Sequence, residues 1–186
     1  YKRLFTWYKK DKMEIIVAEK SGLCYGVKRA LQIAKKTRET KGSNIFTFGD
    51  LIHNPQIISD LEIHGIHSIE DLNRIQSGTV IIRSHGVSPH IYSQLAKKNI
   101  EIIDATCPIV KKIQKLVEKL AKKEAEIIIV GNKEHPEIQG LIGYSQGKGI
   151  IIENESQVKT LSPRKRRIVL VQSTQDLLLL KKVASS

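Results

Sequence analysis

The sequence predicts an α/β protein built from repeated units, in which small parallel sheets are covered by helices. Three observations lead to this fold class. Short β-branched apolar runs, bounded by glycine or polar turns, alternate with segments of helical periodicity along the 186 residues. These runs lack a polar face, as expected for parallel strands buried on both sides. The same order of elements begins again near the middle of the chain.

The first half contains four apolar runs typical of strands, with helical segments between them. Prolines at the first turns of two helical segments, and glycines at 42 and 65, mark where helices begin and end. The expected strands cover residues 14–18, 45–48, 79–83 and 101–104, and the expected helices cover residues 28–41, 55–64, 70–75 and 89–98.

The second half repeats this alternation. Its expected strands cover residues 125–130, 149–152 and 168–171, and its expected helices cover residues 107–123, 137–143, 157–161 and 175–184. We expect a first unit at residues 13–106 and a second unit at residues 107–186, preceded by an N-terminal extension at residues 1–12.

The spacing of reactive residues supports the duplication. A cysteine precedes the first long helix of each unit, and these two residues, Cys24 and Cys107, lie 83 positions apart. His53 follows Cys24 by 29 residues, and His135 follows Cys107 by 28 residues. Each histidine comes four residues after a strand-ending glycine, and a proline follows it within two positions. Such coincidences in order predict a duplicated unit of about 83 residues.

The charge of the chain favours an anionic partner. Lysine and arginine number 31 against 19 acidic residues, which gives a net charge of +12. One alternative is therefore a nucleic-acid-binding α/β protein, prompted also by the basic cluster Arg164–Arg167. Aromatic residues make up only 5% of the chain, and their scarcity argues against a base-stacking platform and against a nucleic-acid partner.

Targeting and membrane signals are weak. No run approaches the ~20 apolar residues that a bilayer span requires. The basic start of the chain is not followed by the apolar stretch of a secretory signal. The sequence therefore predicts a cytoplasmic protein with no membrane partner.

Three histidines lie at or just after the carboxyl ends of predicted strands: His53, His85 and His135. Open α/β sheets bind ligands at this edge, where loops and helix N-termini converge. Imidazole N–H groups, together with loop amides and the hydroxyls of Ser84 and of Ser173 or Thr174, can bind a phosphate or diphosphate. A lone histidine is more often a surface or capping residue, so the prediction depends on this shared position.

Glu137 is a candidate proton donor because it follows His135 by two residues at the same edge. The alternative is a glutamate that only stabilises the N-terminus of a helix. A phosphate-ester hydrolase with a hard metal ion is a further alternative, but the sequence has no carboxylate pair at this edge to hold one.

The two cysteines are candidate metal ligands. A thiol at a helix N-terminus is favoured as the thiolate, which binds soft metals and iron–sulfur clusters. Two thiolates are too few for a structural zinc ion or a four-cysteine cluster. A third repeat would supply a third cysteine and would leave one iron of a four-iron cluster open to substrate. The alternative is a pair of buried core thiols.

Six stretches of the sequence together closely resemble one enzyme family, the 4-hydroxy-3-methylbut-2-enyl diphosphate reductases of the non-mevalonate isoprenoid pathway. The resemblance runs in order from Met13 to the end of the chain. The stretches are Gly22-Leu23-Cys24-Tyr25-Gly26-Val27, Leu51-Ile52-His53-Asn54, Arg83-Ser84-His85-Gly86-Val87-Ser88, Asp104-Ala105-Thr106-Cys107-Pro108, His135-Pro136-Glu137 and Gln172-Ser173-Thr174.

The resemblance implies a cloverleaf of three units around a [4Fe–4S] cluster held by three cysteines. Cys24 and Cys107 match the first two cysteines, and the third is absent from this chain. The family takes two electrons from ferredoxin or flavodoxin and removes the substrate hydroxyl, which gives isopentenyl and dimethylallyl diphosphates. We expect that these 186 residues alone neither hold the full cluster nor turn over, because the sequence stops at Ser186 within the second unit.

The resemblance also implies roles for the polar residues. His53, His85 and His135 match the residues that bind the diphosphate, and Glu137 matches the proton donor. Ser173 stands where the family usually has threonine, in contact with the region of the substrate hydroxyl. Thr174 is the neighbouring candidate for that contact.

Overall fold

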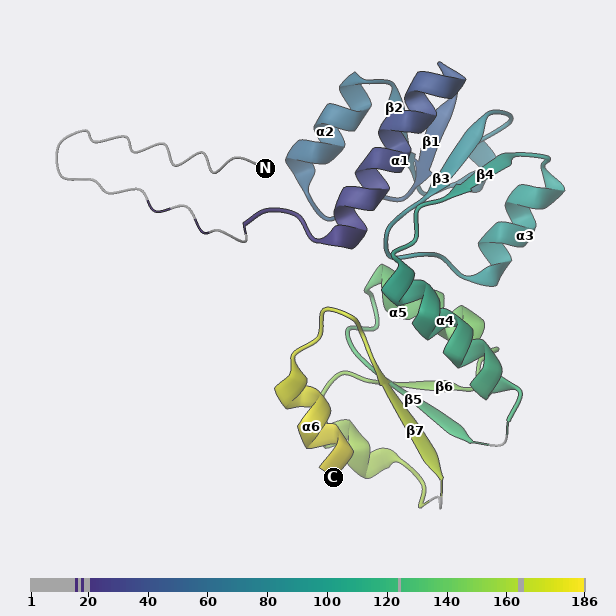
Figure 1. Cartoon of the computed structure of the whole chain (residues 1–186). Helices are drawn as coiled ribbons and strands as arrows, with labels where there is room; N and C mark the ends of the chain where they lie inside the picture. Colours follow the sequence, from purple (N-terminus) through teal and green to yellow (C-terminus); the bar gives the residue numbers. More distant parts are fainter. Residues whose placement is uncertain (1–15, 17, 19–20, 124, 164–165, 186) are drawn as a thin grey trace.

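A computed structural model describes residues 16, 18, 21–123, 125–163 and 166–185, and it confirms the α/β fold with parallel sheets (Figure 1). The first unit contains a four-stranded sheet and the second unit a three-stranded sheet. The elements of the first unit are α1 (Tyr25–Lys41), β1 (Ile45–Phe48), α2 (Pro55–Ile63), β2 (Ile66–Ile69), a 3₁₀ turn η1 (Leu72–Arg74), β3 (Thr79–Ile82), α3 (Pro89–Lys97) and β4 (Glu101–Asp104).

The first sheet has the order β2-β1-β3-β4, and all of its pairs are parallel. Alternate residues of its strands pack on opposite faces, as the two-residue period of a strand requires. On one face, Ile45 and Ile81 pack with Ala30 and Ala34 of α1. On the other face, residues of β3 pack against η1 and α3. Figure 1 shows α1 and α2 on one side of the sheet and α3 on the other.

The second unit repeats this plan. Its sheet has the order β6-β5-β7, which matches β2-β1-β3 of the first unit, and its pairs are parallel. One face of β5 packs on α4 and α5, and the other packs on η2 and α6. The elements are α4 (Pro108–Ala121), β5 (Glu126–Val130), α5 (Pro136–Tyr144), β6 (Gly149–Ile152), a 3₁₀ helix η2 (Glu155–Thr160), β7 (Arg167–Val171) and α6 (Leu177–Ser185).

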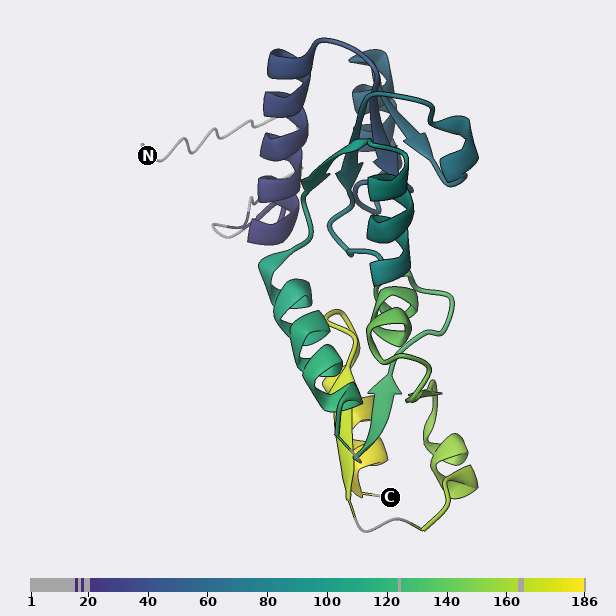
Figure 2. The ribbon, with the colours of Figure 1, turned by 90° about the vertical axis from the view of Figure 1, so that its right-hand side faces the viewer.

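The two units stack end to end, with α4 and α5 at the junction below the first sheet (Figure 2). The strands of the first sheet precede residues 106–107 in the sequence, and the strands of the second sheet follow them. The sequence predicts the boundary between the units at this point. The boundaries of the units and of the N-terminal extension stay predictions. Among the described residues, no helix is both long and apolar enough to cross a membrane.

Several predicted elements are corrected. The expected strand at residues 14–18 is wrong at Ile16 and Ala18, which have no regular structure, and its other residues lie outside the described part. The expected helix at residues 70–75 is only the 3₁₀ turn η1, where the Asp71 carboxylate caps Asn73 N in place of a longer helix. Strand β2, at the edge of the sheet, was not predicted, because Gly65 and two histidines around it resemble a turn.

The start of α1 also differs from the prediction. The helix begins at Tyr25, three residues before the expected Lys28, so that Cys24 is its N-cap residue. Part of the basic cluster at 164–167 lies outside the described residues, whereas Arg167 begins β7 and donates to Glu126 at 2.6 Å.

Candidate active site at the junction of the units

Backbone hydrogen bonds join three loops that leave the first sheet. Ser84 N, after β3, donates to Leu51 O, after β1, at 3.0 Å. Cys107 N, after β4, donates to Ser84 O at 2.8 Å. The loops that carry His53, His85 and Cys107 are therefore fixed to one another at the carboxyl edge of the sheet.

The structure brings His53, His85 and His135 together at this edge. The ring centroids of His53 and His85 are 4.2 Å apart, and each lies 5.3 Å from the ring of His135. One nitrogen of each ring lies within 4.8 Å of the others. Two of these rings come from the first unit and one comes from the second. We call the three residues the histidine cluster.

The protonation of His135 follows from its hydrogen bond. His135 is the N-cap of α5, and its Nδ1 accepts from Glu137 N at 3.1 Å. A backbone N–H can only donate, so Nδ1 carries no proton and the neutral ring holds its proton on Nε2. His135 therefore offers an N–H donor to the cluster. A donor suits an anion, whereas a metal ion would require a free lone pair on this nitrogen.

His85 is partly buried, and its surroundings disfavour its charged form. Burial, followed by the neighbouring His53, His135 and Arg83, lowers the pKa of His85 to about 3. Burial, then His53 and Arg83, also lowers the pKa of His135. His85 Nδ1 is buried and has no hydrogen-bond partner among the described residues. Near neutral pH these two rings are uncharged, and His85 has a polar atom without a protein partner.

We expect His85 to make folding stability depend on pH. Its pKa is about 3 in the folded protein against 6.5 unperturbed, so the unfolded chain binds the extra proton first. The stability of the wild type therefore falls as pH drops from 6.5 towards 3. Urea denaturation at several pH values should show a smaller loss for His85→Gln. His90→Gln, an exposed histidine of α3, is the control and should follow the wild type.

Arg83 contributes a positive charge beside the cluster. It follows β3, and its guanidinium lies so close to Gly49 that a Cβ there would collide with Nη1. Burial lowers the pKa of Arg83, while Glu70 and Asp50 act in the opposite direction. Among the described residues no ion pair within 4 Å is formed by Arg83. Sequence reasoning gave this arginine no role, although it immediately precedes Ser84-His85 at a strand end.

The side chain of Glu137, in the first turn of α5, is hydrogen-bonded to Ser173 in the loop after β7. Its side chain is 1% exposed, and its two oxygens accept from Ser173 N at 2.8 Å and from Ser173 Oγ at 2.7 Å. Its backbone N–H donates to His135. The alternative of a glutamate that only stabilises the helix N-terminus is therefore too simple. The carboxylate joins the hydroxyl of Ser173 to the loop of His135.

Thr174 lies one residue further on and has a different partner. Its Oγ1 accepts from Gln172 Nε2 at 2.8 Å. Gln172 is 6% exposed and, like Arg83, received no role from the sequence. A glutamine directly after an apolar strand is the signal that would have pointed to it.

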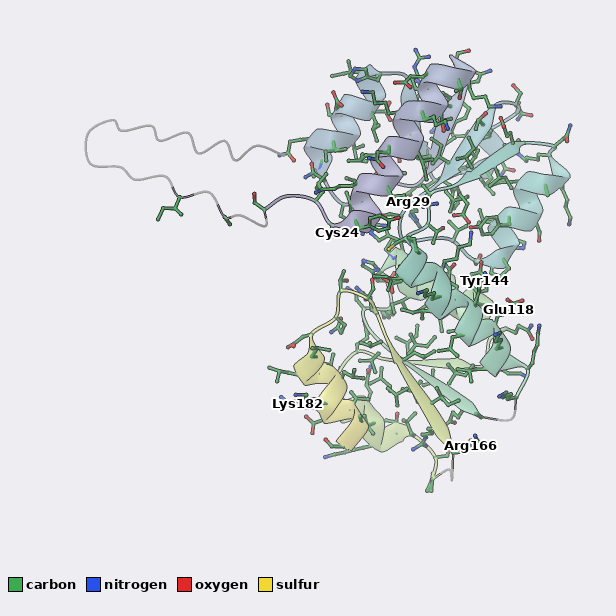
Figure 3. All side chains as sticks on the ribbon, in the orientation of Figure 1. Cys24, Arg29, Glu118, Tyr144, Arg166 and Lys182 are labelled. Atoms are coloured by element: carbon green, nitrogen blue, oxygen red, sulfur yellow. The ribbon has the colours of Figure 1, made fainter. Side chains whose placement is uncertain are left out.

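The two cysteines are the N-cap residues of α1 and α4, and neither thiol makes a capping hydrogen bond. A Cβ on Gly26, in the first turn of α1, would lie 2.7 Å from Cys107 Sγ. Arg29 of α1 donates to Thr106 O at 3.2 Å, beside Cys107. Figure 3 shows Cys24 and Arg29 at the end of α1 that faces the second unit. The two helix N-termini thus meet at the junction.

This geometry fits a soft metal group. Helix N-termini favour thiolates, and thiolates bind iron–sulfur clusters. Cys24 is exposed and Cys107 is partly exposed, so the alternative of two buried core thiols is wrong. The donor set on this chain is two thiols, which is part of the set that a four-iron cluster requires.

Taken together, the fold and the site define a class: an α/β protein with three clustered imidazole rings, a buried carboxylate bound to a hydroxyl, and two free thiols at helix N-termini. The LytB protein family model matches residues 15–186, and the chain belongs to this family.

Curated relatives carry one name. The chain is 39% identical over 164 residues to a 4-hydroxy-3-methylbut-2-enyl diphosphate reductase of Geobacter metallireducens, covering 88% of this chain and 58% of the relative. It is 42% identical over 166 residues to the reductase of that name from Caldanaerobacter subterraneus subsp. tengcongensis, covering 87% and 58%. The chain thus spans less than two thirds of the length of these relatives.

Two solved structures are similar in fold. One is (E)-4-hydroxy-3-methyl-but-2-enyl diphosphate reductase, the terminal enzyme of the non-mevalonate pathway, with a TM-score of 0.81 and 36% identity over 92% of this chain and 62% of that chain. The other is the E-1-hydroxy-2-methyl-but-2-enyl-4-diphosphate reductase from Plasmodium falciparum, with a TM-score of 0.84 and 30% identity over 90% and 55%.

Proposed function

We propose that this chain serves the reaction named for its relatives, the reductive removal of the hydroxyl group of 4-hydroxy-3-methylbut-2-enyl diphosphate. Two electrons and two protons are consumed, the C–O bond breaks, and the hydroxyl leaves as water. The products are isopentenyl and dimethylallyl diphosphates. The observation that carries the proposal is the histidine cluster, because it gathers three imidazole rings from both units at one point.

In this proposal the histidine cluster binds the diphosphate of the substrate. Neutral imidazole rings donate N–H to phosphoryl oxygens, as the tautomer of His135 favours. His85 has a buried nitrogen without a protein partner, which an anion or its water can satisfy. Arg83 adds a permanent charge nearby, so binding does not depend on protonated histidines.

Cys24 and Cys107 would hold the iron–sulfur group, in agreement with their thiols at adjoining helix N-termini. A [4Fe–4S] cluster, when bound, supplies the electrons for the cleavage of the C–O bond. Because the chain has two cysteines, a third cysteine ligand would come from outside these 186 residues. We propose ferredoxin or flavodoxin as the electron donor, in line with the family resemblance and with the net charge of +12.

Glu137 would supply a proton to the leaving hydroxyl, and Ser173 would contact that hydroxyl. The hydrogen bond between Ser173 Oγ and the carboxylate at 2.7 Å supports this assignment, because a proton taken up by the carboxylate can pass through the serine hydroxyl to the loop after β7. Serine retains the hydroxyl that threonine usually provides at this position in the family.

The binding step can be tested with inorganic diphosphate and calorimetry on this chain. We expect His53→Gln and His85→Gln each to weaken binding by about tenfold or more, because a hydrogen bond to a charged group is lost. His90→Gln, the exposed histidine of α3, is the matched control and should bind like the wild type.

Two results would contradict the proposal. One is diphosphate binding that is equally strong in His53→Gln and the wild type. The other is tight binding of duplex DNA that weakens steeply with salt and is unchanged in both histidine variants, which would favour the nucleic-acid alternative.

A further inference from the structure

Gln172 links two strand-end loops of the second unit. It follows β7 directly, and its backbone N–H donates to Val130 O, the last residue of β5, at 2.9 Å. Its side-chain Oε1 accepts from Asn132 N at 3.2 Å, and its Nε2 donates to Thr174 Oγ1 at 2.8 Å. One side chain therefore joins the loop that leads to His135 and the loop that carries Thr174.

The orientation of the Gln172 amide is fixed by its surroundings. The N–H of Asn132 can only donate, so the oxygen of the amide must face it and the NH₂ group must face Thr174. The side chain is 6% exposed, and it packs closely on Gly131, where a Cβ would lie 2.8 Å from Oε1. A flipped amide would place its NH₂ group against the N–H of Asn132 and would lose that hydrogen bond.

The amide in turn fixes the direction of the Thr174 hydroxyl. The NH₂ group has hydrogens and no acceptor, so Thr174 Oγ1 accepts and its own hydrogen remains free to donate. Ser173 has the opposite arrangement, because its hydroxyl donates to the carboxylate of Glu137. The two adjacent hydroxyls thus offer a donor at Thr174 and a lone pair at Ser173.

We propose that Gln172 is a positioning residue that presents the hydroxyl of Thr174 to the substrate as a hydrogen-bond donor. This inference rests on the proposed function and deepens it. An anionic phosphoryl oxygen only accepts, so it matches the donor at Thr174. The hydrogen of a substrate hydroxyl or of a water molecule matches the lone pair of Ser173. The chain thereby distinguishes the two polar ends of one small substrate.

The substitution Gln172→Glu tests the direction of this hydrogen bond with almost no change in shape. A carboxylate still accepts from Asn132 N, but it also accepts from Thr174, so the threonine hydrogen turns away from the substrate. The substitution adds a negative charge as well. Asn132→Asp is the matched control for that charge, because Asn132 is exposed and its side-chain oxygen accepts from Glu134 N, which a carboxylate can also do.

We expect Gln172→Glu to weaken the binding of inorganic diphosphate about tenfold more than Asn132→Asp does. In a Thr174→Val background, Gln172→Glu should weaken diphosphate binding no more than Asn132→Asp does, because position 174 then has no hydroxyl whose direction can change. A purely structural role of Gln172 would give the same loss in both backgrounds, and that result would overturn the inference. Thermal denaturation of each variant verifies that it is folded.

A second measurement does not depend on diphosphate binding. In nitrogen-15 NMR spectra, one side-chain N–H signal of Gln172 should move upfield and exchange faster in Thr174→Val, because its acceptor is lost. An unchanged signal would overturn the inference even if the histidine variants behave as proposed. The opposite outcome is also informative. If the NMR signal shifts as expected but the wild type does not bind diphosphate, the orientation of the Thr174 hydroxyl is supported and the proposed function is contradicted.

Discussion

Replacing Glu137 with alanine should lower the free energy of unfolding by about 2–3 kcal/mol. The side chain is 1% exposed and accepts two hydrogen bonds from Ser173. Alanine leaves those donors without their partner and leaves a void between α5 and the loop after β7. Urea denaturation at neutral pH measures this difference.

Glu137→Gln is the matched variant, because the amide can accept from Ser173 N with its oxygen and donate to Ser173 Oγ with its nitrogen. Its stability should stay within about 1 kcal/mol of the wild type. In a longer protein that contains this region and turns over, the proposed role of Glu137 as proton donor predicts that the same variant loses about 10²–10⁴-fold in rate, because an amide cannot deliver the proton. Equal stability losses for Ala and Gln would show that the hydrogen bonds to Ser173 contribute little.

The substitution Gly26→Ala should also destabilise the protein strongly, although alanine is the better helix former. In an open helix position the change would stabilise by about 1 kcal/mol. Here the new Cβ would lie 2.7 Å from Cys107 Sγ and 3.2 Å from Cys107 Cβ. We expect a net loss of about 1–3 kcal/mol, as is usual for overpacking, together with faster reaction of Cys107 with a thiol reagent as α1 and α4 move apart.

Gly140→Ala is the control for this experiment. Gly140 lies in α5, and a Cβ there would be 3.6 Å from its nearest neighbours, Gln114 Nε2 and Val87 C, which is an ordinary contact. The control should be neutral or slightly stabilising. If both alanine variants stabilise the protein equally, the close approach of α1 and Cys107 is not present in solution.

The strands and helices of the core were predictable because burial leaves a plain signal in the sequence. Strands β1, β4 and β6 have the predicted bounds, since each is a short apolar or β-branched run between turn residues. Strand β2 was missed because its four residues, Ile66–Ile69, form neither a continuous apolar run nor a strict alternation of apolar and polar residues. Its place at the edge of the sheet depends on pairing with β1, which a local pattern does not contain.

For the site, the position of residues was more predictable than their hydrogen bonds. The rule that ligands bind at the carboxyl edge of parallel strands was enough to expect His53, His85 and His135 in one region, and their rings do lie together there. The roles of these residues, and of Ser173 and Glu137, stay predictions.

The contacts of Arg83 and Gln172 could not be predicted in the same way. They depend on which loops approach each other in three dimensions, as when Gln172 reaches Asn132 across 40 positions of sequence. A donor or acceptor direction appears only when both partners are known.

The bonds from Ser84 N to Leu51 O and from Cys107 N to Ser84 O use main-chain atoms alone. A substitution other than proline leaves the backbone N–H and C=O groups of these two hydrogen bonds in place. The alignment of the three loops therefore depends on the main chain and not on the identity of these side chains. Side chains around the candidate site can therefore change while the backbone arrangement that holds them is retained.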